Sequence, residues 1–586
     1  MRLLLSLIVL VSALARVSAQ ETFFRHVTDT ATDTHVELTA LFSEPSRGGY
    51  LPVRVKLSNN LKSDRSARIA FHAELGFQGR IRSDCSYGFA VPAGKTVTQD
   101  ILVPLCPSPS RHTYGDQVRV SATLTGGFGK SSGMIDADTA DLPCVLLSQA
   151  LFTANSSRLD AEVASLTASR YGGNRFAASF LPAQLPSEWL AYSGYDCLLI
   201  SETEWSAVPA GARNAIFSWV RLGGRLIIFT SGGSTAGMLG LPEDPGFGST
   251  SVVRNLFLSG SGTMGSLEIP PRETVEMVKN KPPVQPLAEA ISSNYHSSWP
   301  LQDKFGIRGF HYGLFIVVLI AFSILVGPVN LFVFAKSGRR HRLFLTTPII
   351  SLGASLLLVA LIIFQDGFGG NGERRVLMEV RPEAGENAAY IHQEQFSRTG
   401  ILLGDEFTVD PASFITPVPI ARSRWSRYTD AYDSSGDFDL QPGGGKLRAT
   451  GDWWQSRSEH GHIVSSVVPT RGRIEATQTA DTFVSTFEFP IDRFFYQDKD
   501  GNWFRASDVE TGRRFTVTPV EASVIQPELA AEANAFTYRH RRMLEGAGKR
   551  RDHYVAITDS APGIATHPGI RWKQTRTVIT GPIATP

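Results

Sequence analysis

Ser234 is one of the few residues in this sequence whose neighbours suggest chemistry. It lies in the stretch SGGSTAGM, residues 231–238. A serine nucleophile on a sharp strand-to-helix turn follows the pattern G-x-S-x-G, and here Ala236 replaces the final glycine. A serine hydrolase is therefore kept only as an alternative. The backbone of Gly232, Gly233 and Ser234 could instead hold a small anion or a peptide, and a plain structural turn is the simplest interpretation.

Two histidines form a second candidate group. His460 and His462 follow Glu459, and on a strand their side chains would point to one face, as two metal ligands require. The neighbouring sequence offers no third ligand. No metal site is therefore predicted, although an exported hydrolase that uses a metal here is kept as an alternative.

The chain contains four cysteines. Cys85 and Cys106 lie in one β-rich region of an exported segment and are predicted to form a disulfide, with separate thiols as the alternative. Cys144 and Cys197 lie within apolar runs that are typical of buried strands. We expect both to pack as small hydrophobic residues.

Two long uncharged segments give the strongest signal in the sequence. Residues 314–335 and 344–364 contain no charged residue, and at about 1.5 Å per residue each can cross a hydrocarbon core of about 30 Å. Soluble helices of this length nearly always have a polar face, so a buried soluble pair is the weaker interpretation. The sequence predicts a transmembrane hairpin with helices over 310–335 and 344–365. Pro328 predicts a kink, and Asn330 is placed to bond to the second helix.

The short loop 336–343 determines the predicted orientation. It carries cations without any acid, and the positive-inside rule places such a loop in the cytoplasm. Residues 1–19 indicate a signal peptide, with an apolar core and a small-residue cleavage site. The regions on both sides of the hairpin are therefore expected to be exported. The cations of the loop are Lys336, Arg339, Arg340 and Arg342.

Residues 141–248 have the pattern of an α/β layer. Continuous apolar runs at LPCVLLSQ, YDCLLIS and RLIIFT alternate with helical segments. This alternation is typical of a doubly wound layer around a parallel sheet. Residues 249–309 are rich in loops and are expected to connect this layer to the membrane.

The order of short motifs in this layer carries a resemblance to a known family. The motifs are YD before a strand (195–196), WV at the end of a helix (219–220) and GGRL (223–226). This order resembles the class I glutamine amidotransferase-like domain of bacterial envelope proteins of uncharacterised function. The resemblance implies a preceding sandwich and following membrane helices. Together with the predicted topology, it implies a bacterial inner-membrane protein whose two large exported regions lie in the periplasm. Active amidotransferases use a cysteine beyond this region, and no cysteine follows Cys197, so the resemblance implies a catalytically inactive layer.

The remaining regions alternate polar and apolar residues, as half-buried strands do. Residues 20–140 are predicted to form an immunoglobulin-like β-sandwich. Residues 366–586 are predicted to form an exported C-terminal β-domain with a short helix near 528–549. Asp500-Gly501 in this domain predicts a tight hairpin turn.

These patterns together predict a multidomain α/β plus β protein that binds or scaffolds partners within an envelope complex, without catalysis and without a cofactor. The expected partners are the lipid bilayer and other envelope proteins. The net charge of +2 gives no excess that would indicate nucleic acid. An accessory subunit of an ABC-type transporter is a further alternative.

Overall fold

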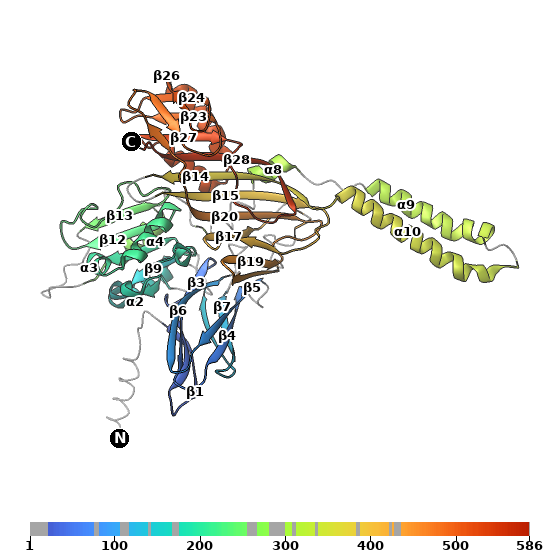
Figure 1. Cartoon of the computed structure of the whole chain (residues 1–586), viewed down its shortest axis with the longest axis horizontal. Coiled ribbons are helices and arrows are strands. Elements are labelled where there is room, and N and C mark those ends of the chain that lie inside the picture. The colour runs from blue at the N-terminus through green and yellow to red at the C-terminus, as the bar shows by residue number, and fades with distance from the viewer. Residues whose placement is uncertain are drawn as a thin grey trace.

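The computed structural model has a sheet-rich body from which a pair of long helices projects (Figure 1). The signal peptide, Cys106 and Lys336 lie outside the residues that it describes. The described residues are 21–75, 81–105, 117–138, 142–166, 175–254, 267–280, 287, 299–306, 312–334, 338–382, 387–420, 423, 425–426 and 435–584.

A β-sandwich forms the N-terminal part of the body. In β4 (Arg65–Leu75) every second residue from Ala67 onward is buried, because successive side chains of a strand point to opposite faces. Phe71 of this strand shares one core with Val53 of the opposing sheet. The first sheet has the order β1 (Glu21–Asp29), β2 (Thr34–Ala40), β3 (Tyr50–Asn59) and β6 (Lys95–Pro104). The second contains β5 (Ile81–Val91), β4, β7 (Gln117–Gly126) and β8 (Ser131–Asp138).

Strands from beyond the helix pair extend the second sheet of this sandwich. β18 runs parallel to β5, with Gly436 opposite Ile81, and the side chain of Asp439 accepts a hydrogen bond from the backbone N–H of Asp84 at 2.9 Å. Trp454 packs in the same core as Phe71. The sequence divides the chain at the hairpin, whereas the folded body joins segments from both sides of it. The added strands are β16 (Phe407–Val409), β18 (Gly436–Gly443) and β19 (Lys446–Gly451).

The α/β unit contains a parallel five-stranded sheet of order β10-β9-β11-β12-β13. Strands β9, β11 and β12 are short apolar runs because helices cover both faces. Ile216 of α4 packs on one face, and Leu159 of α2 and Val275 of α5 pack on the other. The strands are β9 (Val145–Ser148), β10 (Ala178–Phe180), β11 (Cys197–Ser201), β12 (Arg225–Thr230) and β13 (Ser249–Arg254). The helices are α2 (Gln149–Leu166), α3 (Glu202–Ser206), α4 (Ala210–Arg221) and α5 (Pro271–Asn280).

This unit extends beyond the boundary at residue 248 that the sequence predicts. β13 and α5 fall in the region 249–309, which was expected to be a connector. β13 is an edge strand whose residues are only partly buried, so it lacks the continuous apolar run of its neighbours. α5 buries a single apolar face through Val275 and Val278, which is a weak signal in a helix of this length.

A nine-stranded sheet forms the C-terminal part of the body, in the order β17-β20-β15-β14-β28-β27-β23-β24-β26. The predicted hairpin at Asp500-Gly501 connects β23 to β24. The helix predicted near 528–549 is a pair, α11 (Ala522–Asn534) and α12 (Tyr538–Ala547). The strands are β14 (Gly370–Arg381), β15 (Ala388–Thr399), β17 (Ser413–Val418), β20 (Glu459–Pro469), β23 (Ile491–Gln497), β24 (Trp503–Val509), β26 (Thr518–Val520), β27 (His553–Thr558) and β28 (Ile570–Pro582). A small sheet of β21 (Ile474–Ala476), β22 (Thr482–Ser485) and β25 (Arg514–Thr516) lies beside it.

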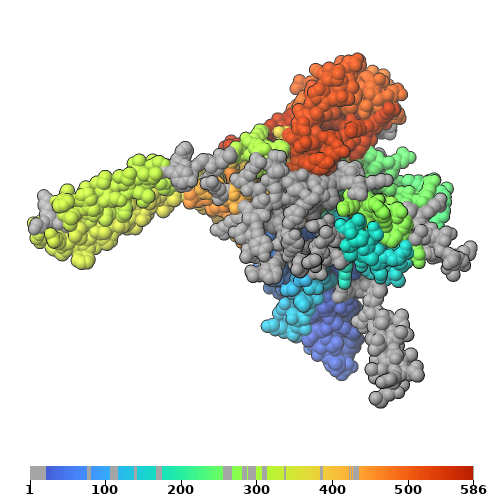
Figure 2. Space-filling model, turned by 180° about the vertical axis from the view of Figure 1, so that it is seen from behind, coloured from blue at the N-terminus to red at the C-terminus, as the bar shows by residue number. Residues whose placement is uncertain are grey.

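The projecting helices stand clear of the body in both views (Figures 1 and 2). α9 (Tyr312–Ile324) continues as a π-helix over Leu325–Phe334 around Pro328, and α10 (Leu343–Asp366) returns to the body. Both helices are long and apolar enough to cross a membrane. Asn330, which is fully buried, donates to Thr347 at 2.9 Å and accepts from Thr346 at 2.6 Å. The predicted bond from Asn330 to the second helix is therefore confirmed.

Candidate functional site

The carboxyl edge of the parallel sheet is where open α/β folds bind ligands. With this strand order the chain reverses direction across the sheet between β9 and β11. Glu204 of α3 fills that position. Its carboxylate accepts hydrogen bonds from the hydroxyls of Ser148 at 2.5 Å and Ser201 at 2.8 Å. It also accepts the backbone N–H of Ala150 in the first turn of α2 at 2.9 Å, and so occupies the place where a helix N-terminus would bind an external anion.

The loop of Gly232, Gly233 and Ser234 lies at the same edge, after β12. Ser234 donates its hydroxyl proton to Glu202, as does Thr230. These two hydrogen bonds lower the pKa of Glu202, so the carboxylate stays ionised and is a weak base. No heavy atom lies within 4 Å of where a Cβ would stand at Gly232 or Gly233, so the loop is open to solvent. Ligand binding by this loop stays a prediction, and the adjacent negative charge disfavours an anion.

The described cysteines are not prepared for nucleophilic chemistry, and Cys197 lies at the opposite, amino end of β11. Cys197 is fully buried in β11, and burial raises the pKa of its thiol to about 12. Nucleophilic attack requires the thiolate, which is scarce at such a pKa. In the sandwich, Cys85 is buried. Since Cys106 lies outside the described residues, its pairing with Cys85 stays a prediction.

His460 and His462 point to one face of β20, as predicted, with ring centroids 6.4 Å apart. One nitrogen of each ring, Nε2, is hydrogen-bonded to the main chain. His460 Nε2 accepts the N–H of Gln455 at 3.0 Å, and His462 Nε2 lies 3.0 Å from the carbonyl oxygen of Trp453. Burial lowers the pKa of His460 to about 4. Within the described ranges, no cluster of three metal-binding side chains is present.

A buried acidic residue that the sequence analysis missed lies on β15. Glu394 is fully buried and accepts hydrogen bonds from Trp299 at 2.9 Å and from His540 at 2.5 Å. The N–H and hydroxyl of Thr537, at the N-terminus of α12, also donate to it, at 3.1 and 2.5 Å. Burial raises the pKa of this carboxyl, but the hydrogen bonds from His540, Thr537 and Trp299 outweigh that effect and lower the pKa. Glu394 therefore ties three distant chain segments together as an anion.

His392 lies on the same face of β15 as Glu394. Together with Ser465 it resembles the histidine–serine pair of a hydrolase. Its Nδ1 is 2.8 Å from the hydroxyl of Ser465, and its ring stacks on His540 at 5.0 Å. Both His392 and Ser465 are buried, and Phe247 of the α/β unit packs against the imidazole. Because both side chains are buried among the described residues, we assign the pair a structural role.

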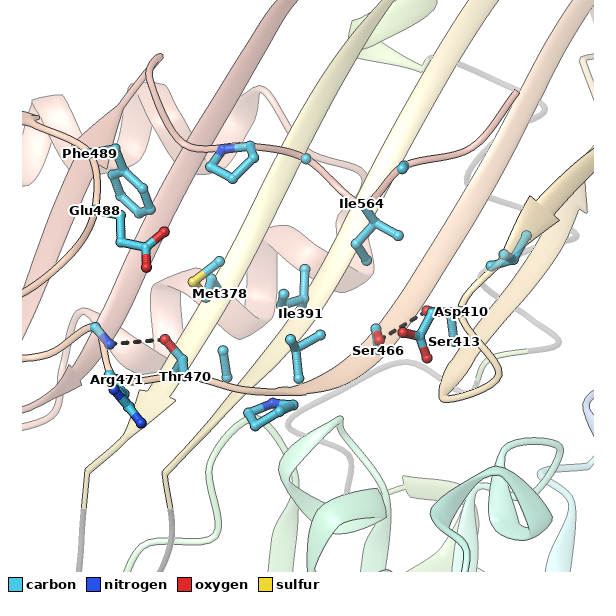
Figure 3. Close-up of a pocket in the computed structure, with 18 of the residues that line it drawn as sticks. Met378, Ile391, Asp410, Ser413, Ser466, Thr470, Arg471, Glu488, Phe489 and Ile564 are labelled. Atoms are coloured by element: carbon cyan, nitrogen blue, oxygen red, sulfur yellow. Dashed lines mark hydrogen bonds between the residues drawn. The ribbon is translucent and has the colours of Figure 1, made fainter. Parts of the chain in front are cut away.

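The opposite face of the nine-stranded sheet lines a groove of about 930 Å³. This volume falls within the range of ligand sites. The floor includes Met378 on β14, Ile391 on β15 and Ser466 on β20 (Figure 3). Val468, also on β20, lines the same groove. Val468 is 37% exposed, so the floor presents apolar surface to solvent.

Charged side chains of both signs stand around the rim of this groove. Asp410 lies near Ser413 and Ser466 at one end, and Arg471 and Glu488 lie at the other (Figure 3). All of these charged residues, and Lys446 at the start of β19, are exposed. Because the two acids and two bases balance, the rim does not select a strongly charged ligand.

A segment of the chain itself already lies across this sheet face. Residues 560–565 form a strap along the groove, and Gln393 binds the main chain of Ile564. Its side-chain oxygen accepts the N–H at 2.8 Å and its amide donates to the carbonyl at 3.1 Å. Gln395 accepts from Gln393 at 3.0 Å and so orients its amide. An extended chain is therefore a shape that this face accommodates.

Comparisons with known proteins do not identify a family for this chain. No family model matches the chain, and no curated protein matches it. Red sea bream transglutaminase shares 19% identity over 18% of this chain and 16% of its own, with a TM-score of 0.14. A calcium-binding mutant of Bacteroides uniformis beta-glucuronidase 2 shares 12% identity over 35% of this chain and 24% of its own, with a TM-score of 0.14. A protein from Arabidopsis thaliana shares 13% identity over 21% of this chain and 83% of its own, with a TM-score of 0.12.

These scores are too low to carry an argument about fold or function. The chain spans less than a quarter of the length of the transglutaminase and of the glucuronidase. The site must therefore be interpreted from its own residues.

Proposed function

We propose that this protein is a membrane-anchored binding or scaffold protein of the bacterial envelope. The observation that carries the proposal is the sheet that joins β5 to β18 across the helix pair. Because residues before and after the helices share one sheet and one core, the helices are an excursion from a single folded body. A pair of apolar helices that leaves such a body and returns to it suits an anchor.

The sidedness of the proposal follows from charge. Both flanking regions must lie on one side of the membrane because they pair with each other. Arg339, Arg340 and Arg342 are exposed at the far end of the hairpin, and the positive-inside rule favours the cytoplasm for that end. The body is then periplasmic, in agreement with the signal peptide expected over residues 1–19.

In this proposal the α/β unit has a structural role. Its strand order and the resemblance of its motifs support an amidotransferase-like layer, and the preceding sandwich is taken to be of immunoglobulin type. Glu204 fills the crevice where a ligand would enter, and Ser234 is bound to a carboxylate. Neither arrangement supports catalysis at this edge.

The binding site of the proposal is the groove on the nine-stranded sheet, and its occupant is an extended segment of a partner protein. The apolar floor would take alternate side chains, and the balanced rim would pair with charges of both signs. The strap at Ile564 shows the same kind of binding within this chain, since Gln393 binds its extended main chain. A partner in the same envelope complex would supply the segment.

Site-specific photocrosslinking in native membranes tests this function. A photoreactive amino acid at position 468, on the groove floor, is expected to capture a discrete partner. The same group at Met134, which is 60% exposed on the far sandwich, serves as the control and is expected to capture none. Identical crosslinking patterns at the two positions would contradict the groove as a binding site. Val468→Arg, which places a charge on the floor, should abolish capture by a probe at position 564.

A further inference from the structure

The C-terminal end of α10, where the helix joins the body, is fixed to the body by several contacts. Asp366, in its last turn, pairs with Arg457 at 2.6 Å and is only 6% exposed. The N–H of Ile401 donates to the carbonyl of Gly367, and the N–H of Gly369 donates to the carbonyl of Ile401, both at 2.9 Å. A Cβ at Gly400 would lie 2.3 Å from the carbonyl oxygen of Asp366, so only glycine allows this close approach. The loop at 400–404 is therefore held at the level where the helix ends.

Large apolar side chains project from this joint into solvent. Leu403, on the fixed loop, is 91% exposed, and Phe368, two residues beyond α10, is 66% exposed. Phe364, in the last turn of the helix, is 87% exposed. Phe368 and Ile401 form an isolated β-bridge, so the aromatic ring and the loop belong to one small element. Exposed apolar residues that are this large and this close together mark an interaction surface.

Cations lie beside the same joint. The first residues of β28 pair in register with the first residues of β14, so that Arg571 stands opposite Asn371. Arg571 and Lys573 are both exposed, and Lys573 Nζ lies 5.7 Å from the centre of the Phe305 ring. His567, just before β28, lies 3.1 Å from the carbonyl oxygen of Gly404. The start of β28 and the loop of Leu403 therefore belong to one face of the body.

We infer that this face is a membrane seat, in which Leu403 and Phe368 enter the lipid interface while Arg571 and Lys573 meet the phosphate groups. The inference rests on the proposed function, because it requires the hairpin to cross the bilayer. The loop that carries Leu403 is bonded through Ile401 to the residues that follow α10, so Leu403 reaches the bilayer boundary wherever the end of α10 does. Aromatic and aliphatic side chains combined with arginine and lysine are the composition of interfacial anchors. The body would then be held at a fixed distance from the lipid surface instead of moving freely on a tether.

Depth-dependent quenching tests the seat on the full-length protein. The protein is reconstituted in vesicles of phosphatidylethanolamine and phosphatidylglycerol that carry a quencher at the lipid headgroup or in the acyl chain. A fluorescent amino acid is placed in turn at positions 403, 352 and 134. Leu352, which is 62% exposed in the middle of α10, reports insertion of the hairpin, and Met134 reports the distant sandwich.

We expect the acyl-chain quencher to act at position 352, the headgroup quencher to act strongly at position 403, and neither to act at position 134. Quenching at 352 without quenching at 403 would overturn the seat and leave the anchor intact. Absence of quenching at 352 would overturn both, whatever happens at 403. Equal quenching at 403 and 134 would reveal non-specific adsorption and would also overturn the seat.

A second measurement tests the role of Arg571 and Lys573. Arg571→Gln combined with Lys573→Gln is expected to reduce quenching at position 403 in vesicles that contain phosphatidylglycerol, and to have a smaller effect in vesicles of phosphatidylcholine alone, because only the former carry net negative charge. An equal loss in both kinds of vesicle would exclude these two side chains from the seat.

Discussion

At the scale of single residues, Glu394 is the most consequential side chain in the body. It is an ionised carboxylate without solvent exposure, and its donors are Trp299, before the hairpin, and Thr537 and His540, at the start of α12. A buried charge of this kind is tolerated only when its hydrogen bonds are complete. The residue therefore stabilises one specific packing of these segments.

Removal of this carboxylate should be costly. Glu394→Ala removes the buried carboxylate that accepts hydrogen bonds from Trp299, Thr537 and His540, and we expect a loss of about 3–5 kcal/mol in the free energy of unfolding. Glu394→Gln keeps the shape and one acceptor and should lose less. The measurement is denaturant unfolding of the purified protein in detergent. Glu276→Ala is the matched control, because its exposed pair with Arg272 is worth under about 1 kcal/mol. Equal effects at the two positions would refute the role of Glu394.

The buried histidines predict how stability changes with pH. A histidine in the unfolded chain titrates near 6.5, whereas burial lowers the pKa of His460 to about 4. Between these values only the unfolded chain binds the proton, so the contribution to stability is complete above pH 6.5 and decreases as the pH falls toward 4. Burial also lowers the pKa of His462 and of His392, which adds to the effect.

Thermal unfolding between about pH 7.5 and about pH 5 measures this dependence. The unfolding midpoint should decrease toward the acid end. His460→Gln keeps a hydrogen-bond acceptor for Gln455 but cannot titrate, so the slope should become shallower in that variant. An unchanged slope would show that His460 does not contribute to the acid sensitivity.

At the scale of elements, the N-terminus of α2 is closed by the chain's own Glu204. Glu204→Ala would leave the N–H of Ala150 and the hydroxyls of Ser148 and Ser201 without an acceptor, and we expect a cost of about 1–3 kcal/mol. The variant should then be stabilised by inorganic phosphate, because a free helix N-terminus binds anions. The unfolding midpoint with and without phosphate is the measurement.

The control for this variant is Ser234→Ala, which leaves Glu204 in place and should show no response to phosphate. Stabilisation of the unaltered protein by phosphate, lost in Ser234→Ala, would instead indicate that the loop of Gly232, Gly233 and Ser234 holds the anion. The experiment thus separates the two positions at this sheet edge.

The elements that the sequence predicts are those whose pattern is local. The hairpin and the buried strands β9, β11 and β12 are continuous apolar runs, and β4 alternates regularly. β15 was missed because both of its faces are buried, and Glu394, Gln393 and His392 interrupt its apolar character. A strand of this kind has neither alternation nor a hydrophobic run to identify it.

The groove and the joined sheet were not predictable for a related reason. Ile391 and Val468 are unremarkable until β15 and β20 lie side by side, and the pairing of Gly436 with Ile81 spans most of the chain. Local propensity contains no information about partners at such separation. Ser234 and His460, by contrast, were found by their residue types, although the structure assigns their polar atoms to internal bonds.

At the scale of the whole molecule, the body should fold without its hairpin. Arg398 donates to the carbonyl of Gly306, where the body leads to α9, and Gly400, two residues further along, contacts Gly367 after α10. The two ends of the excursion are therefore close together. Since β18 pairs with β5, the segments before and after the hairpin contact each other directly and do not need the helices to hold them together.

Replacement of residues 307–366 by a short glycine-serine linker is expected to give a protein that stays in solution without detergent and unfolds cooperatively, as measured by gel filtration and thermal unfolding. In this linked chain Phe438→Ala should reduce the free energy of unfolding by about 3–5 kcal/mol, because Phe438 of β18 packs in the core of the N-terminal sandwich. Hydrogen exchange should then increase in β4 and β5, far away in the sequence. Increased exchange confined to the C-terminal sheet would mean that the two halves fold separately, and the argument for a single body on one side of the membrane would fail with it.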